Sequence, residues 1–141
     1  MHTGGAPCQT ENTTGMAHSI LAEVARMLDA LAADGTTGSI DLRSLPLTEA
    51  DRQQLEELLG RGEVVAELEL AGRSSVWETA YAGAWWVRHR GAGDKISSEE
   101  ITVCPIPDIL ITHPADIKAA ALRIKQEILE NHPSQAEATN G

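Results

Sequence analysis

Three tryptophans within ten residues constrain this chain more than any other feature. Trp77, Trp85 and Trp86 are its only Trp residues, and its 141 residues include one Tyr and no Phe. A buried Trp removes a large apolar surface from water, and Trp is also enriched at the centres of binding interfaces. The segment around these residues is therefore either the centre of the core or the surface that contacts a partner.

Apolar and polar residues alternate around the tryptophans, which predicts strands at 64–70, 75–81, 84–90 and 96–103. Successive side chains of a strand point to opposite faces, so Trp85 and Trp86 cannot share a face. We expect Trp77 and Trp85 to anchor the core. We expect Trp86 on an uncovered sheet face. The predicted partner-binding residues are Trp86, Glu78, Arg88 and Cys104.

Helical spacing of apolar residues predicts three helices. The first spans 18–33, with Ser19 as its N-cap and Gly35 just past its end. The second is capped by Thr48, with Asp51 completing a capping box, and it ends at Gly60. A short extended piece at 39–42 lies between them. The third helix begins at Pro114 and runs to 131.

These elements predict an α+β fold. We expect an antiparallel sheet of about four strands, with two N-terminal helices and one C-terminal helix packed mainly on one face. Residues 1–15 are predicted to be a disordered tail, residues 16–131 a single domain, and residues 132–141 a second disordered tail.

The charge balance excludes some classes of partner. Asp and Glu number 21 against 11 Lys and Arg, for a formal net charge of -10. This argues against binding to nucleic acid or to an anionic membrane surface. No apolar run reaches the roughly 18–20 residues that a membrane span needs. The start of the chain lacks the pattern of a signal peptide. We expect a cytoplasmic protein without a membrane span.

Reactive groups are sparse. The two cysteines, Cys8 and Cys104, have no CxxC partner, and the five histidines lack HxH or HxxxH spacing. We therefore expect no bound metal or cofactor. The serine pairs 74–75 and 97–98 have no local His. Cys104 is either a small buried residue or a thiol that contacts a metal or a partner's thiol.

Four stretches together resemble the hydrogenase expression/formation accessory proteins of the HupH/HyaF family. They are residues 45–51 (LPLTEAD), 58–64 (LLGRGEV), the pair 77–79 (WET) and 85–87 (WWV), and the strand end at 106–107 (IP). The resemblance covers about residues 40–130. It implies a non-catalytic helper in the maturation of uptake [NiFe] hydrogenases.

The resemblance also implies partners: a hydrogenase subunit bound before assembly, in association with a rubredoxin-like accessory protein. Two alternatives stay open. One is a small enzyme that uses Cys104 or a carboxylate such as Glu78, which requires His89 or His113 within hydrogen-bond reach. The other is a homodimeric structural module that uses the exposed Trp for self-association.

Overall fold

The computed structural model describes residues 12–69 and 72–131, which fall into two compact units. The first unit extends to Pro107 and the second begins at Asp108. The boundary lies inside the segment 16–131 that the sequence analysis treated as one domain. Each unit is described by itself. None of the described helices is long and apolar enough to cross a bilayer.

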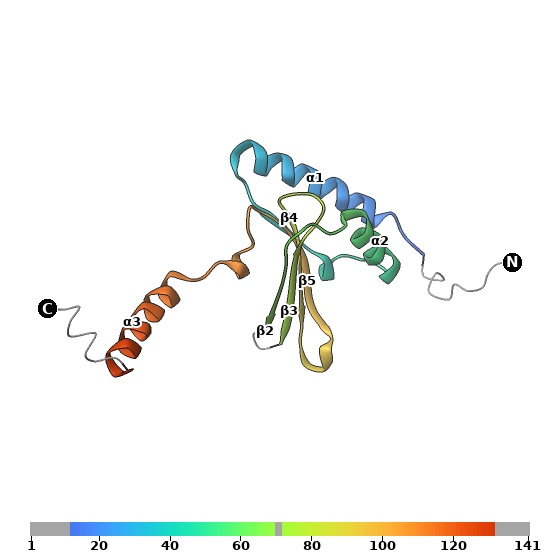
Figure 1. Cartoon of the computed structure of the whole chain (residues 1–141). Coiled ribbons are helices and arrows are strands. Elements are labelled where there is room, and N and C mark those ends of the chain that lie inside the picture. Colours follow the sequence, from blue (N-terminus) through green and yellow to red (C-terminus); the bar gives the residue numbers. More distant parts are fainter. Residues whose placement is uncertain (1–11, 70–71, 132–141) are drawn as a thin grey trace. The chain divides into compact units, whose positions relative to one another are not determined.

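The first unit has a mixed α+β architecture, as predicted (Figure 1). Its elements are α1 (Met16–Asp34), β1 (Gly38–Asp41), η2 (Leu42–Ser44), α2 (Glu49–Leu59), β2 (Val65–Glu69), β3 (Arg73–Glu78), β4 (Ala84–Arg90), η3 (Ala92–Asp94) and β5 (Ile96–Val103). The strands form one antiparallel sheet in the order β1-β5-β4-β3-β2. The sheet has five strands rather than about four, because the extended piece at 39–42 pairs with β5 through Ile40 and Ile101.

Both helices of this unit cover the same face of the sheet. The buried cluster joins α1, α2 and the strands through Ala17, Ile20, Val24, Leu42, Leu55, Leu59, Trp77, Ala84, Trp86, Ile101 and Val103. Burial of this apolar surface is the main term that holds the layers together. Figure 1 shows the helices at one end of the strands, while the β2/β3 and β4/β5 hairpins extend away from them.

Helix α1 begins at Met16, two residues before the predicted start. Its N-cap is Gly15, whose φ of 92° is a conformation that glycine adopts readily. Ser19 lies inside the helix, where its N–H donates to the Gly15 carbonyl at 3.2 Å, so its prediction as N-cap was wrong. Ala17 is fully buried and adds a further turn to the apolar stripe. The predicted end is confirmed, because the Gly35 N–H donates to the Leu31 carbonyl at 2.9 Å.

The capping box of α2 is confirmed and holds the start of the described chain. The Asp51 N–H donates to Thr48 Oγ1, and the Thr48 N–H donates to Asp51 Oδ2. The N–H and hydroxyl of Thr14 both donate to the Asp51 carboxylate at 2.7 Å. Thr14 belongs to the predicted tail at 1–15, so the part of that tail from residue 12 contacts α2. The predicted tails at 1–11 and 132–141 lie outside the described residues.

The second unit contains η4 (Asp108–Leu110) and α3 (Pro114–Asn131). Helix α3 begins at Pro114, as predicted, and His113 Nδ1 accepts a hydrogen bond from the Ala115 N–H at 3.0 Å. The apolar residues Ile117, Ile124 and Ile128 are exposed in this unit. The described residues of this unit therefore do not bury these side chains by themselves.

The capping carboxylate makes stability depend on pH. Burial alone raises the pKa of Asp51, but hydrogen bonds from Thr14 and Thr48 outweigh it and hold the pKa below its usual value. A carboxylate with a lowered folded pKa stabilises the fold above its unfolded pKa of about 3.9. That contribution is lost as the pH falls through the lower folded pKa.

We expect Asp51→Asn to lower the free energy of unfolding at pH 7 by about 1–2 kcal/mol, because an amide nitrogen cannot accept the hydrogen bonds that an oxygen accepts. The difference from wild type should begin to shrink below about pH 4, where the Asp51 carboxyl of the unfolded wild-type chain binds a proton before that of the folded chain does. Urea denaturation between pH 7 and pH 3 measures both effects. A difference that stays constant across this range would contradict the assignment.

Candidate functional site

The connection between β3 and β4 decides which tryptophans share a face. The Thr79 N–H donates to the Ala84 carbonyl at 2.9 Å, which leaves four residues, 80–83, in the turn. The register then places Trp77 opposite Trp86, and Glu78 opposite Trp85. Directly opposed residues of two antiparallel strands point to the same face. Trp86 therefore lies with Trp77 on the side of the sheet that the helices cover.

Trp77 and Trp86 form a stacked pair in the core. Their ring centroids are 5.6 Å apart and their planes differ by 8°. Trp77 is 2% exposed and Trp86 is 0% exposed. The predicted core position of Trp77 is confirmed, whereas the prediction that Trp86 lies on an uncovered face is wrong. Trp85 is buried as predicted, but on the opposite face from Trp77. We expected Trp85 beside Trp77, and Trp86 lies there instead. The four-residue turn sets this register, and a shift of one residue would exchange the faces of the two side chains.

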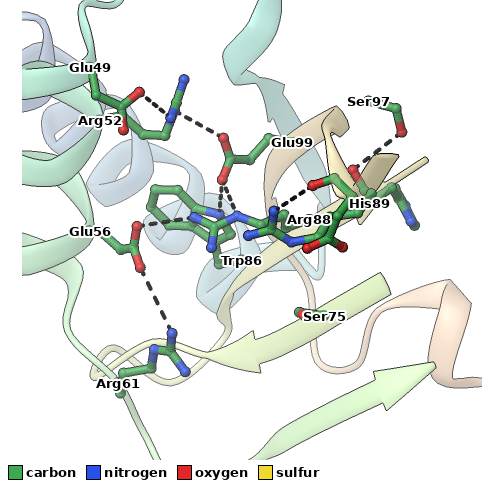
Figure 2. Close-up of polar contacts among 12 residues, drawn as sticks. Glu49, Arg52, Glu56, Arg61, Ser75, Trp86, Arg88, His89, Ser97 and Glu99 are labelled. Atoms are coloured by element: carbon green, nitrogen blue, oxygen red, sulfur yellow. Dashed lines mark hydrogen bonds and ion pairs between the residues drawn. The ribbon is translucent and has the colours of Figure 1, made fainter. Parts of the chain in front are cut away.

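A buried carboxylate lies directly beside the stacked pair. Glu99, on β5, is 1% exposed, and its Oε2 accepts hydrogen bonds from Trp86 Nε1 at 2.9 Å and from Arg88 Nε at 2.6 Å. Its Oε1 lies 3.1 Å from Arg52 Nε on α2. Figure 2 shows Glu99 pointing between Arg52 on one side and Trp86 and Arg88 on the other. A buried charge without such partners would be strongly unfavourable.

The charge network extends from Glu99 along α2 to the surface. Arg88 Nη2 also contacts Glu56 Oε1 at 3.1 Å, and Arg61 Nη2 lies 3.8 Å from Glu56 Oε2. At the other end, Arg52 Nη1 contacts Glu49 Oε1 at 2.6 Å. The network thus contains three carboxylates and three guanidinium groups, and its charges balance.

Arg88 is held inside this network rather than offered to a partner. It is half-buried, with 14% of its side chain exposed. Burial opposes its charge, but Glu99 and Glu56 outweigh that effect and raise the pKa of Arg88. Trp86 and Arg88 were both predicted to bind a partner, and both instead bind Glu99 within the fold.

Arg61 closes the network over the tryptophan pair. Its guanidinium carbon lies 3.9 Å from the centroid of the Trp77 ring, a cation–π arrangement. The glycines on either side of it are required by the local geometry. Gly60 has a φ of 65°, and a Cβ on Gly62 would lie 2.6 Å from the Thr79 carbonyl oxygen. These contacts explain the Gly-Arg-Gly sequence between α2 and β2.

The other two predicted site residues lie elsewhere. Glu78 is half-buried. It lies directly opposite Trp85 on the neighbouring strand, so it faces away from the helices. Trp85 Nε1 donates to the carbonyl of Cys104 at 3.1 Å. Cys104 is buried, which agrees with its interpretation as a small core residue. The structure therefore divides the predicted site into Trp86 with Arg88 on one face and Glu78 with Cys104 around Trp85 on the other.

A serine–histidine pair was missed by the sequence analysis. Ser74 Oγ lies 2.6 Å from His89 Nδ1, because the two residues are opposed across β3 and β4. Only the strand register could have revealed this pair. Ser74 is buried. His89 lies four residues along β4 from the position opposite Glu78, which is about 13 Å at strand spacing. His113 caps α3 in the second unit.

The described part of the chain has no group of three or more His, Cys, Asp or Glu residues that could hold a metal ion. Cys8 lies outside the described residues.

Comparison with known proteins places the chain in a family. Residues 15–131 match the family model described as HupH hydrogenase expression protein, C-terminal conserved region. The chain belongs to the HupH hydrogenase expression protein family. A solved structure, the hydrogenase expression protein HupH from Thiobacillus denitrificans ATCC 25259, superposes with a TM-score of 0.81 and 34% sequence identity. The match covers 84% of this chain and 99% of that one, so the two share one fold.

Curated relatives are longer. Hydrogenase-1 operon protein HyaF of Escherichia coli (strain K12) is 30% identical over 115 residues, which cover 82% of this chain and 38% of the relative. Hydrogenase expression/formation protein HupH of Rhodobacter capsulatus is 31% identical over 109 residues, 76% of this chain and 39% of the relative. The matched region spans about two fifths of each of these proteins.

The stretches that carried the resemblance have structural roles in this fold. The segment 45–51 contains the capping box of α2, and the segment 58–64 contains the Gly-Arg-Gly turn. The two tryptophan stretches contribute the stacked pair and the opposite-face Trp85. Pro107, from the last stretch, is buried. The segments that resemble the family therefore have structural roles in this fold.

We expect Trp86→Ala to destabilise the fold by about 3–5 kcal/mol, because it removes a fully buried indole and its stacked partner contact. It also leaves Glu99 without one hydrogen-bond donor. Urea denaturation followed by tryptophan fluorescence measures the loss. A variant as stable as wild type would show that Trp86 is not in the core.

We expect Glu99→Gln to cost about 3 kcal/mol or more, because it keeps the side-chain shape but leaves the half-buried Arg88 with less compensation. The matched control is Arg61→Gln at the exposed end of the network, which should cost less than about 1 kcal/mol. Chemical denaturation at low and at high salt measures the loss in the free energy of unfolding of each variant. Equal losses for both variants would contradict a buried role for Glu99.

Proposed function

We propose that this chain is a non-enzymatic accessory module that binds an immature hydrogenase subunit before assembly. The observation that carries the proposal is an exposed apolar pair at the edge of the sheet. Val64 and Val65 are 43% and 54% exposed, although Val65 lies opposite the core residue Trp77 in the β2–β3 register. Exposed apolar side chains on a sheet edge are a feature of binding surfaces.

The choice of partner follows from the family. The relatives are named as a hydrogenase operon protein and as hydrogenase expression or formation proteins. Because this chain spans about two fifths of the curated relatives, the partner of the whole relative is proposed here for this region. The net charge of -10 favours a partner with a basic surface. Complementary charge speeds the encounter of two proteins and disfavours wrong partners.

A role in binding rather than catalysis is supported by how the polar groups are used. Glu99, Arg88, Arg52 and Glu56 bind one another and fix α2 to the sheet. His89 binds Ser74 across two strands. These groups therefore stabilise the fold. The exposed sheet edge at Val64 and Val65 is the part that we propose to bind a partner.

The test is binding to purified hydrogenase subunits. We expect the tagged chain to retain an immature large or small subunit and to retain much less of the assembled hydrogenase, since assembly buries the recognised surface. Biolayer interferometry with each purified subunit gives the affinities. An unrelated acidic protein of similar net charge is the control. Equal binding to both proteins, or to none of the subunits, would contradict the proposal.

Two further partner predictions can be tested with the same material. A rubredoxin-like accessory protein is proposed to join the complex, on the basis of the family resemblance. The alternative is that the chain uses the same exposed surface to form a homodimer. Sedimentation velocity of the chain alone, and then with the subunit and the accessory protein, separates the two.

A further inference from the structure

Strand β2 forms an edge of the sheet. Within residues 12–69 and 72–107, it pairs with β3 on one side and has no strand on the other. The Glu78 N–H donates to the Val64 carbonyl at 2.9 Å. Backbone groups alternate between the two sides of an antiparallel strand, so those of Ala66 also face β3. The backbone groups of Val65 and Glu67 therefore point away from the sheet.

The two edges of the sheet differ in how they are protected. The other edge strand, β1, has only four residues, starts at a glycine and leads directly into η2. Short edge strands, prolines and lysines commonly prevent further pairing. Neither edge strand contains proline or lysine, but β2 has five residues against four in β1, and Val64 and Val65 at its start are exposed. Strand β2 is therefore the edge that can accept an additional strand.

The side chains along β2 define the chemistry of the segment that would fit. Glu63, Glu67 and Glu69 are exposed, and Glu67 accepts a hydrogen bond from Ser75 Oγ at 3.0 Å. Ala66 and Leu68 face the other side and are half-buried. A second copy of β2 would bring two acidic rows together. A strand with basic side chains on one face and apolar side chains on the other would complement both sides.

We propose that β2 is the docking edge for an extended segment of the immature hydrogenase subunit in which basic and apolar residues alternate. This inference rests on the proposed function and specifies the surface that carries it. Backbone hydrogen bonds to Val65 and Glu67 supply the pairing, as in strand addition to a sheet edge. The acidic row next to Val65 selects the basic face of the incoming segment.

The decisive variant is Val65→Pro, which removes an outward N–H without removing a hydrogen bond to β3. Val65→Thr is the matched control, since it keeps the N–H and suits a strand. We expect Val65→Pro to weaken binding of the purified subunit by about tenfold or more, and Val65→Thr by much less. A thermal melt of each variant confirms that the fold is retained.

A second measurement does not depend on a substitution. Residue-resolved amide exchange of the wild-type chain should show rapid exchange at Val65 and Glu67 in the free protein and protection in the complex. Ala66, whose N–H faces β3, is the internal reference. Peptides that scan the subunit sequences should bind best where Lys or Arg alternates with apolar residues.

The outcomes separate this inference from the proposed function. If the wild-type chain binds no hydrogenase subunit, the proposed function fails. If it binds one, but Val65→Pro binds equally well and the amides of Val65 and Glu67 stay unprotected, only the edge assignment is overturned. Self-association that disappears in Val65→Pro would assign the edge to a second copy and also overturn this inference.

Discussion

The carboxylate of Glu99 is a buried charge that joins α2 to the sheet. It is buried between the sheet and α2, where an unpaired charge would be costly. Trp86 and Arg88 donate hydrogen bonds to its Oε2, and Arg52 forms an ion pair with its Oε1, which accepts no hydrogen bond from the described residues. Because Arg52 belongs to α2 and the other two to β4, these contacts to one group fix the helix on the sheet. They also position the Trp86 indole against Trp77.

This arrangement changes how the aromatic and charged residues are interpreted. Three tryptophans and several arginines near each other suggest an interaction surface, yet the stacked Trp pair and Arg88 lie inside the fold. Arg61 marks the boundary, since it is exposed and covers Trp77. The surface beyond it, on β2, is apolar and acidic. Recognition in this family member is therefore better sought at the sheet edge than at its most conspicuous side chains.

Much of the fold could be predicted from the sequence, whereas little of the candidate site could. The α+β class, the Thr48–Asp51 capping box and the Gly35 helix end follow from local patterns, and the structure confirms them. Strand β1 was recognised only as an extended piece, because its partner β5 lies some sixty residues away. The Ser74–His89 pair and the Glu99 network were missed for the same reason, since each joins residues distant in sequence.

The sequence alone determined that Trp85 and Trp86 face opposite ways, because side chains alternate along any strand. Which of the two lies beside Trp77 follows from the packing of the whole unit. That choice depends on the four residues between Thr79 and Ala84 and on the face that α1 and α2 cover. A turn of one residue more or fewer would exchange the two faces. Local periodicity therefore fixes relative directions, while register and helix packing fix which direction is inside.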